Sequence, residues 1–486
     1  MPRLKIITEE TQKEITFSGA PVLKDLLKQE GYFIDSPCGG NGKCGKCTVK
    51  LFDGISHSNN LQWEIKLACK TILTADTTVK LPEIFIENAF VETDIGTIQS
   101  KNCKFQYGAA LDIGTTTIAL KLFSKEGKAV AEAVSVNPQR SVSSDVMGRI
   151  SAAVDGKLPL LNLQITDCIN NLFENICNTA GIERKDIEKT VITGNTAMLY
   201  LLCGINPKSI AVAPFKADNL FGVEINSPVK AYLPPCINAF VGADLVCSVI
   251  ASGMCESNKT ALLCDIGTNG EIALWKNGRL YVTSAAAGPA FEGAEISCGC
   301  PCVDGAIDKV WFENQRIFTH TINNSPAVGI CGSGLIDAVA AFLEQGYIDS
   351  DGISPSVLNL PSHGKPISIT AEDIRALQLA KSAVCSAIET VLAATSVEFD
   401  EIEAFYLVGG FGNRLNLDSA VEIGLIPKAL ARKTKQMGNG ALKGAAMILF
   451  DEGLKQKAIE TALKAEHIQL GGNELFNQRF CENLRF

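Results

Sequence analysis

The sequence predicts an α+β unit at the N-terminus, followed by a larger α/β part built from two similar lobes. Three observations support this fold class. Three cysteines and four glycines gather in "DSPCGGNGKCGKC" (35–47), after a strand–helix pattern. Two similar strand–turn–strand segments, "YGAALDIGTTTIALKLF" (107–123) and "TALLCDIGTNGEIALW" (260–275), place their aspartates 153 residues apart. Glycine-rich turns also stand at several expected helix starts.

Composition narrows the class of protein. The 486 residues are 46% hydrophobic and 20% charged, which is typical of a globular chain with about three domains. The net charge of −9 argues against nucleic acid as a partner. No uncharged run approaches the length of a membrane span, and "MPRLKIITEE" (1–10) lacks an apolar core, so we expect a cytoplasmic protein without a membrane partner. Most of the 18 cysteines are then expected to be thiols or metal ligands.

The N-terminal elements follow from local patterns. The segments "RLKIIT" (3–8) and "KEITF" (13–17) are strand-like, and "APVLKDLLKQEG" (20–31) has the apolar spacing of a helix that ends at a glycine. After the cysteine stretch, "TVKLF" (48–52) and "TVKLPE" (78–83) are again strand-like. These elements predict a compact α+β unit.

Four cysteines in this unit have spacing suited to metal. Five residues separate Cys38 from Cys44, two separate Cys44 from Cys47, and twenty-one separate Cys47 from Cys69. Four thiolates can hold two irons bridged by two sulfides, and the intervening glycines let the loop fold tightly around them. Structural zinc is the main alternative, but zinc ribbons usually pair two Cys-x-x-Cys knuckles and this segment has one.

This stretch resembles the ferredoxin family of the β-grasp fold over residues 1–90. The five-residue first gap is similar to that of the adrenodoxin branch. The resemblance implies a 2Fe–2S cluster on Cys38, Cys44, Cys47 and Cys69 that carries one electron. Residues 91–106 are expected to be a linker.

The two repeated hairpins predict a phosphate site. Glycine and threonine in a tight turn direct backbone N–H and hydroxyl groups toward one point, which favours an anion. Asp112 and Asp265, at the strand ends, are suited to hold hydrated Mg²⁺ or to orient a water. The other candidate residues of the two turns are Gly114, Thr115, Thr116 and Thr117 in the first, and Gly267, Thr268, Asn269 and Gly270 in the second.

Three further segments place glycine turns before helices. They are "VITGNTAM" (191–198) with Gly194 and Asn195, "GICGSGLIDAVAAFLEQG" (329–346), and "AFYLVGGFGNRL" (404–415) with Gly409, Gly410 and Gly412. Such turns let a ligand approach the backbone near the positive end of a helix.

The order of these five elements resembles the superfamily of acetate and sugar kinases, chaperones and actin, from about residue 107 to 450. The resemblance implies a two-lobed actin-like ATPase with ribonuclease H-like repeats that binds ATP and Mg²⁺ between its lobes. In these terms the first lobe spans 107–255, the second spans 256–455, and 456–486 form a C-terminal segment. Residues 329–335 are similar to one of the connecting segments, and 408–412 to the adenosine loop.

A ferredoxin domain fused to this ATPase resembles the ATP-dependent reductive activators of corrinoid proteins. The stretches "VNPQRSVSSDVMGRI" (136–150), "AAAGPAFEGAEISCG" (285–299) and "GAIDKV" (305–310) add to that match. The resemblance implies one-electron reduction of inactive Co(II) corrinoid in a partner corrinoid protein to Co(I), with an upstream low-potential electron donor. Two alternatives stay open: activation of another low-potential acceptor, and a non-catalytic redox-sensing scaffold that binds ATP.

The sequence departs from this family in two places. Longer members carry an additional, dimerising domain before the first phosphate loop, where this chain has only 91–106, so formation of a homodimer is left open. The loop "CGCPC" (298–302) is unusual, and its three alternate cysteines are poorly spaced to bind one metal together. The four histidines, His57, His320, His363 and His467, are scattered and are expected to be structural or exposed.

Overall fold

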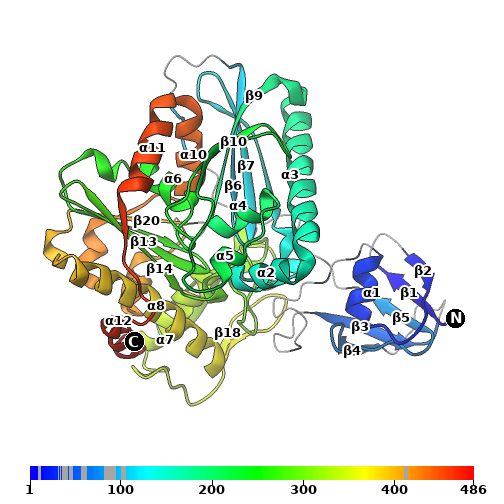
Figure 1. The fold of residues 1–486 in the computed structure, drawn as a ribbon. Helices are drawn as coiled ribbons and strands as arrows, with labels where there is room; N and C mark the ends of the chain where they lie inside the picture. Colours follow the sequence, from blue (N-terminus) through cyan, green and yellow to red (C-terminus); the bar gives the residue numbers. More distant parts are fainter. Residues whose placement is uncertain are drawn as a thin grey trace. The chain divides into compact units, whose positions relative to one another are not determined.

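The computed structural model describes residues 1–8, 12–30, 32, 34, 42, 47–55, 63–81, 95–99, 105–409 and 414–486. The chain forms two compact units (Figure 1). The first comprises Met1–Glu87 with Pro138–Arg149, and the second comprises Asn88–Asn137 with Ile150–Phe486.

The first unit contains a five-stranded sheet in the order β2-β1-β5-β3-β4. Strand β1 pairs antiparallel with β2 and parallel with β5, so the sheet is mixed and the parallel pair requires a crossover. This arrangement confirms the predicted β-grasp unit. Its elements are β1 (Arg3–Ile7), β2 (Gln12–Thr16), α1 (Leu23–Gln29), β3 (Thr48–Asp53), β4 (Glu64–Leu67) and β5 (Thr77–Lys80).

Helix α1 supplies part of this unit's core. Its apolar residues Leu23, Leu26 and Leu27 are buried, as their helical spacing predicts, and they share one core cluster with Leu4 and Ile6 of β1. Strand β4 was not predicted: it has only four residues, and although they alternate between polar and apolar, its Ile65 is exposed.

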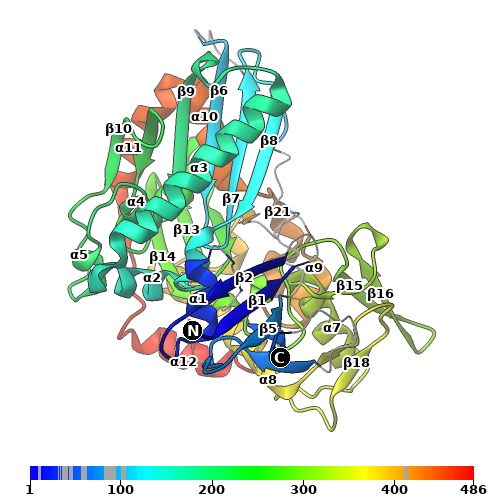
Figure 2. The same cartoon turned by 90° about the vertical axis from the view of Figure 1, so that its right-hand side faces the viewer.

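The second unit contains two six-stranded sheets of similar plan (Figures 1 and 2). Their orders are β10-β11-β9-β6-β7-β8 and β21-β20-β12-β13-β14-β22. The first sheet comprises β6 (Tyr107–Ile113), β7 (Thr117–Ser124), β8 (Ala129–Val136), β9 (Ile187–Gly194), β10 (Phe221–Ile225) and β11 (Ala231–Pro235). The second comprises β12 (Ala261–Ile266), β13 (Asn269–Lys276), β14 (Arg279–Ala286), β20 (Ala404–Val408), β21 (Thr434–Gln436) and β22 (Ala465–His467).

Strand pairing confirms the internal repeat. Strand β6 pairs antiparallel with β7 and parallel with β9, and β12 pairs antiparallel with β13 and parallel with β20. Asp112 and Asp265 therefore occupy equivalent places near the ends of β6 and β12, just before their hairpin turns. The register aligns Asp112 with Thr193 of β9, and Asp265 with Val408 of β20.

Helices cover the sheets and bury their apolar faces. In Figures 1 and 2, α3 and α10 lie on opposite faces of the sheet that contains β6 and β7. The helices are α2 (Val146–Ala152), α3 (Leu158–Ala180), α4 (Thr196–Leu202), α5 (Lys208–Ala211), α6 (Ala243–Ser252), α7 (Gly332–Glu344), α8 (Ala371–Ala394), α9 (Leu417–Glu422), α10 (Gly440–Phe450), α11 (Glu452–Lys464) and α12 (Glu474–Glu482).

The C-terminal residues fold back onto the second lobe. Strand β22 pairs parallel with β14, and α12 places Phe476 and Phe480 against the core that includes α8. Helix α8 is long and apolar enough to cross a membrane by composition, but 78% of its most apolar window is buried within the protein. Helix α8 is therefore a core helix of the second unit. Smaller sheets are β16-β15-β17 (Arg316–Thr321, Ala306–Glu313, Gly329–Ile330) and β18-β19 (Leu358–Leu360, Ile367–Ile369).

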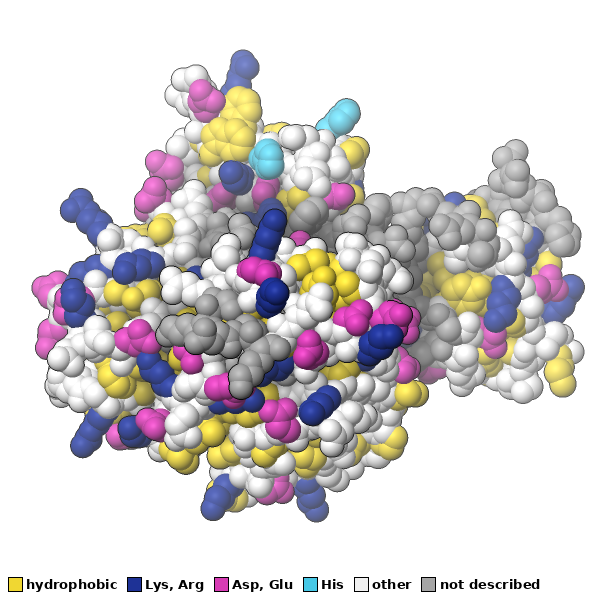
Figure 3. Space-filling model, turned by 90° about the horizontal axis from the view of Figure 1, so that it is seen from above, with side chains coloured by type: hydrophobic (Ala, Val, Ile, Leu, Met, Phe, Trp, Pro, Cys, Tyr) yellow, Lys and Arg dark blue, Asp and Glu magenta, His cyan; other side chains and the backbone are white. Residues whose placement is uncertain are grey.

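Charge is mixed on the face of the protein that is drawn in Figure 3. On the face drawn in Figure 3, Lys and Arg side chains are interspersed with Asp and Glu side chains. This face therefore presents neither sign of charge as a continuous field to a partner.

Candidate functional site

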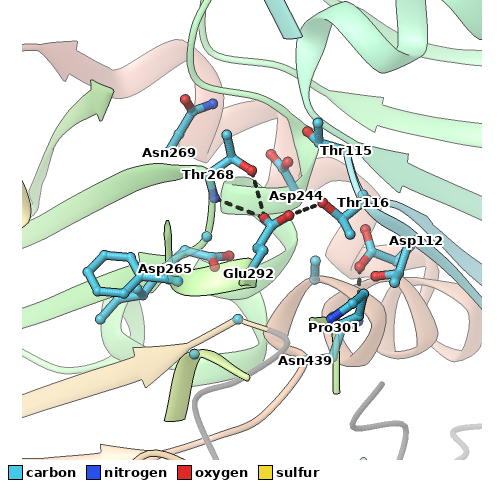
Figure 4. A pocket seen from close by; sticks show the side chains of 18 of the residues that line it. Asp112, Thr115, Thr116, Asp244, Asp265, Thr268, Asn269, Glu292, Pro301 and Asn439 are labelled. Atoms are coloured by element: carbon cyan, nitrogen blue, oxygen red, sulfur yellow. Dashed lines mark hydrogen bonds between the residues drawn. The ribbon is translucent and has the colours of Figure 1, made fainter. Parts of the chain in front are cut away.

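A cavity in the second unit is lined by both repeated hairpins (Figure 4). It brings together residues that are far apart in the chain. Equivalent strands pair in the two sheets, so the two hairpin turns hold these residues at equivalent places. Most of the residues that the sequence singles out line it: Asp112, Gly114, Thr115, Thr116, Thr117, Asn195, Asp265, Gly267, Thr268, Asn269 and Gly409.

Each hairpin is closed by its glycine. The Gly114 N–H donates to the Thr117 carbonyl at 2.9 Å, and the Gly267 N–H donates to the Asn269 carbonyl at 3.1 Å. A Cβ at Gly114 would lie 2.7 Å from that same Thr117 oxygen, so a larger residue would force the first turn open. The intervening threonines are thereby presented to the cavity.

Glu292 links the two hairpins (Figure 4). Its carboxylate accepts hydrogen bonds from the Thr268 N–H at 3.1 Å and the Thr268 hydroxyl at 2.6 Å, and from the Thr116 hydroxyl. Backbone N–H and hydroxyl donors of this kind suit any anion. The carboxylate therefore occupies a place between the repeats where the donors would serve equally well for a phosphate oxygen.

Four more carboxylates crowd the same cavity. Burial raises the pKa of Asp112 to about 6 and that of Asp265 to about 7, and for Asp265 repulsion from Asp112 adds to the rise. Burial, followed by repulsion from neighbouring carboxylates, also raises the pKa of Asp244 and of Glu271. Such a concentration of negative charge favours a divalent cation, because the cation removes the repulsion and is held by hard oxygen ligands.

Two neighbouring residues, Asn439 and Gly409, define the surroundings of the strand-end aspartates Asp112 and Asp265. The Asn439 amide, at the start of α10, donates to Asp112 at 2.9 Å. Gly409 follows β20 with φ of +111°, and a Cβ there would lie 2.7 Å from the Asp265 carboxylate. Glycine at this position therefore allows the backbone after β20 to pass directly beside Asp265.

Some of the residues expected from the sequence are not in the cavity lining. Gly194 and Gly270 instead allow neighbouring segments to pack closely. A Cβ at Gly194 would lie 2.8 Å from the Ile113 carbonyl oxygen, and a Cβ at Gly270 would lie 2.8 Å from the Val384 side chain. Gly410 and Gly412 lie outside the described residues.

Four polar residues that line the cavity were not among the predicted site residues, although Glu271 was placed in the second phosphate hairpin. They are Asp244, Glu271, Glu292 and Asn439. The sequence could have identified Glu271 as a site residue, because it belongs to the second repeated turn. Asp244 and Asn439 also carry a weak signal, since each stands at a helix start after a glycine. Glu292 ends the short 3-10 helix Pro289–Glu292, and its only signal was that it lies in the stretch 285–299 that resembles the family.

The first unit brings two of the four expected metal ligands together. The Cys47 and Cys69 sulfurs lie 3.2 Å apart, and neither sulfur is in a disulfide. Cys47 is buried and Cys69 is partly exposed. Cys38 and Cys44 lie outside the described residues. Two thiols that face one another, from the residue before β3 and from the turn after β4, match half of the expected four-cysteine ligand set.

Family models match three parts of the chain. Residues 7–74 match a "2Fe-2S iron-sulfur cluster binding domain", residues 107–257 match the "RACo middle region", and residues 259–486 match the "C-terminal domain of RACo the ASKHA domain". The first match covers the cysteine unit, and the other two cover the two repeats.

Several relatives are similar along most of the chain. "Corrinoid activation enzyme RamQ" of Eubacterium limosum is 31% identical over 78% of this chain and 70% of its own length. "[Co(II) methylated amine-specific corrinoid protein] reductase" of Methanosarcina barkeri is 27% identical over 77% of this chain and 76% of its own length. The solved structure "Reductive activator for corrinoid,iron-sulfur protein" is 26% identical, with a TM-score of 0.72, over 99% of this chain and 98% of that one.

Proposed function

The chain belongs to the family of reductive activators of corrinoid proteins, and we propose that it reduces the inactive Co(II) corrinoid of a partner corrinoid protein to Co(I) with the help of ATP. The observation that carries the proposal is the pairing, in one chain, of a 2Fe–2S domain with an actin-like cavity between two phosphate hairpins. The solved structure that matches 99% of this chain is named a reductive activator, and two relatives that match more than three quarters of it are named a corrinoid activation enzyme and a Co(II) corrinoid protein reductase.

The described part of the first unit fits a 2Fe–2S cluster. Cys47 and Cys69 place two thiols side by side, and glycines surround the other two cysteines in the sequence. We propose Cys38, Cys44, Cys47 and Cys69 as its ligands. When bound, such a cluster supplies a one-electron carrier. The chain's own contribution is to bury Cys47 and to keep Cys69 closer to the surface.

The cavity of the second unit fits Mg²⁺ and ATP. We propose that Asp112 and Asp265 hold the cation or its water, and that Thr116 and Thr268 donate to phosphate oxygens in the place where they now donate to Glu292. One electron moved uphill by ~150 mV costs about 3.5 kcal/mol. This cost slightly exceeds a typical allosteric coupling free energy of about 1–3 kcal/mol. Nucleotide binding or turnover is therefore a suitable source for the rest of the free energy that the electron transfer needs.

Further features belong to this proposal. We place domain boundaries near residues 90, 106, 255 and 455, between the ferredoxin domain, the segment 91–106, the two lobes and the C-terminal segment; within 91–106, Ile95 and Ile98 pack into the core that includes β6 and β7. An upstream low-potential donor supplies the electron, and the protein works in the cytoplasm as a monomer or a homodimer. The mixed surface charge agrees with recognition of a protein partner through shape and local polar contacts (Figure 3).

The proposal is tested by anaerobic mixing of the reduced holoprotein with a Co(II) corrinoid protein. Cobalt absorbance is followed with MgATP, with a non-hydrolysable analogue, and without nucleotide. We expect Co(I) to accumulate with MgATP, and comparison with the analogue distinguishes turnover from binding.

Other outcomes would refute the proposal. Reduction of a different low-potential acceptor, with Co(II) left unchanged, would assign the chain to another activation reaction. ATP binding that depends on the redox state of the iron, without any acceptor reduced, would indicate a sensing scaffold.

The iron content provides an independent prediction. Anaerobically purified protein should contain about two irons and two sulfides per chain. The Cys69→Ser variant should lose most of both, because a hydroxyl is a poor ligand for this metal, whereas Cys168→Ser, outside the first unit, should keep them. Stoichiometric zinc with no visible absorbance would contradict the assignment.

The buried carboxylates predict a pH-dependent nucleotide affinity. Cation binding requires ionised carboxyls, and the pKa values of Asp112 and Asp265 are raised to about 6 and about 7. Protons therefore compete with Mg²⁺ as the pH falls from 8 to 6, and the affinity for MgATP should fall about tenfold. Titration with a fluorescent ATP analogue at several pH values measures this, and an affinity that stays constant or rises toward pH 6 would be inconsistent with the carboxylate site.

A further inference from the structure

The second repeat carries a buried carboxylate that has no counterpart in the first. In the register of β12 and β13, Asp265 faces Glu271 directly, whereas in β6 and β7 the equivalent Asp112 faces Ala119. Side chains that are directly opposite in an antiparallel pair lie on the same face of the sheet, with their Cβ atoms about 5 Å apart. Two side chains of like charge therefore meet beside this turn, an arrangement that the stability of the sheet alone does not favour.

Glu271 lies on the face of β13 that is covered by α6. The preceding Gly270 belongs to the other face, since a Cβ there would lie 2.8 Å from the Val384 side chain of α8. Two residues after Glu271 and on its own face, Ala273 shares a core cluster with Leu245 of α6. Glu271 itself lines the cavity, so its side chain stands beside this apolar layer and faces the nucleotide site.

The Glu271 carboxylate is buried without a hydrogen-bond partner. Glu271 is 5% exposed, and no donor among the residues that the structure describes contacts its oxygens. Other carboxylates of the cavity do have donors: Asp112 accepts from Asn439, and Asp244 accepts the next backbone N–H at 2.9 Å. Glu292 accepts from the two threonines of the hairpins (Figure 4). A buried carboxylate needs a donor, and a molecule that enters the cavity can supply one to Glu271.

We propose that Glu271 accepts a hydrogen bond from the water that attacks ATP, so that the protein hydrolyses the nucleotide instead of only binding it. The inference rests on the proposed function, because it takes the cavity to be the nucleotide site. There, Asp112 and Asp265 are assigned to the cation, and the hairpin threonines to phosphate oxygens. Glu271 is the buried carboxylate that these assignments leave without a donor, and it stands directly across from Asp265.

The hydrolysis exchanges one phosphorus–oxygen bond for another. The water oxygen bonds to the γ-phosphorus, while the bond from that phosphorus to the oxygen shared with the β-phosphate breaks, and ADP leaves with this oxygen. One proton of the water stays on the inorganic phosphate, and the other passes to the solvent. Phosphoryl transfer depends mainly on positioning and electrostatic stabilisation, so a fixed acceptor that orients the water is an effective contribution.

The test measures phosphate release and nucleotide binding separately, on the holoprotein mixed with a Co(II) corrinoid protein. For Glu271→Ala we expect the kcat of phosphate release to fall about 100-fold, the usual cost of a misplaced reactant. The affinity for a fluorescent ATP analogue should stay within about threefold of the original value, because the lost contact is made to the water. Glu271→Gln keeps an oxygen that accepts the same hydrogen bond, so it should recover part of the rate. Glu313→Ala, at the exposed end of β15, is the control and should change neither quantity.

Several results would overturn the role of Glu271. Unchanged phosphate release by Glu271→Ala would do so, and so would a Glu271→Gln variant as slow as the alanine variant. A higher Mg²⁺ requirement for analogue binding by Glu271→Ala would make the residue a ligand of the cation instead. If alanine unfolds the protein, Glu271→Leu keeps most of the volume, removes both oxygens and gives the same comparison.

The unsubstituted protein separates this inference from the proposed function. Reduction of Co(II) that depends on ATP but releases no phosphate would overturn the inference and leave the proposed function in place. Phosphate release that depends on Glu271, without any reduction of Co(II), would refute the proposed function and support the role of Glu271.

Discussion

Asp265→Asn will abolish nucleotide-dependent corrinoid reduction and, at the same time, stabilise the fold. Removal of this charge takes away a proposed ligand of the cation, so we expect nucleotide-dependent turnover to fall about 10²–10³-fold, as for the loss of other charge-stabilising groups. Iron content should not change, because the four cysteines that we propose as cluster ligands belong to the other unit. Single-turnover reduction of Co(II), with iron and sulfide assays, measures both quantities.

The stability effect has a defined sign. The folded protein raises the pKa of Asp265 from its usual 3.8 to about 7, so the folded state loses stability as the pH rises through this window. Asparagine has the same shape and no charge. Without Mg²⁺ we expect the variant to gain about 1–3 kcal/mol near pH 8 and almost nothing near pH 4, since the cavity admits water that screens part of the repulsion.

Asp308→Asn is the matched control for both effects. Asp308 is also buried, but it lies outside the cavity lining and accepts a 2.6 Å hydrogen bond from His320. Loss of that paired charge should destabilise the fold and leave nucleotide affinity in place. Thermal unfolding at pH 5 and pH 8 distinguishes the two variants. Normal turnover by Asp265→Asn, or a loss of stability at pH 8 comparable to that of the control, would refute the assignment.

Glu292→Gln will bind MgATP about tenfold more tightly than the unsubstituted protein. The Glu292 carboxylate accepts hydrogen bonds from Thr116 and Thr268, the donors that we assign to phosphate oxygens. An incoming phosphate must displace this carboxylate or remain beside its negative charge. Glutamine keeps the size of the side chain and removes the charge, and tenfold tighter binding corresponds to about 1.4 kcal/mol.

The control for this prediction is Glu295→Gln. It removes the same charge three residues further on, from an exposed side chain that does not line the cavity. Equilibrium binding of a fluorescent ATP analogue at constant ionic strength compares the two variants. Weaker binding by Glu292→Gln would show that the carboxylate assists the nucleotide or its cation. Equal gains in both variants would show only a general charge effect.

Short sequence patterns were sufficient to predict those strands, turns and helices whose geometry depends only on their own few residues. An apolar strand that ends in Asp-Ile-Gly-Thr specifies a strand and a tight turn, so Asp112 and Asp265 were predicted as a pair. The helical spacing of Leu23, Leu26 and Leu27 likewise predicted α1. Gly194 and Gly270 show the limit of such patterns, because a glycine that admits a ligand and one that admits a neighbouring strand or helix look alike in sequence.

By itself, the sequence determined the β-grasp unit, the repeated hairpins, the four-cysteine spacing and the family. The tertiary structure alone decided which distant groups complete the cavity. Glu292 meets a threonine 176 residues away, and Asn439 meets an aspartate 327 residues away. The physical reason is that a turn is specified by its own few residues, whereas a buried carboxylate or amide takes its partner from whichever segment long-range packing brings beside it.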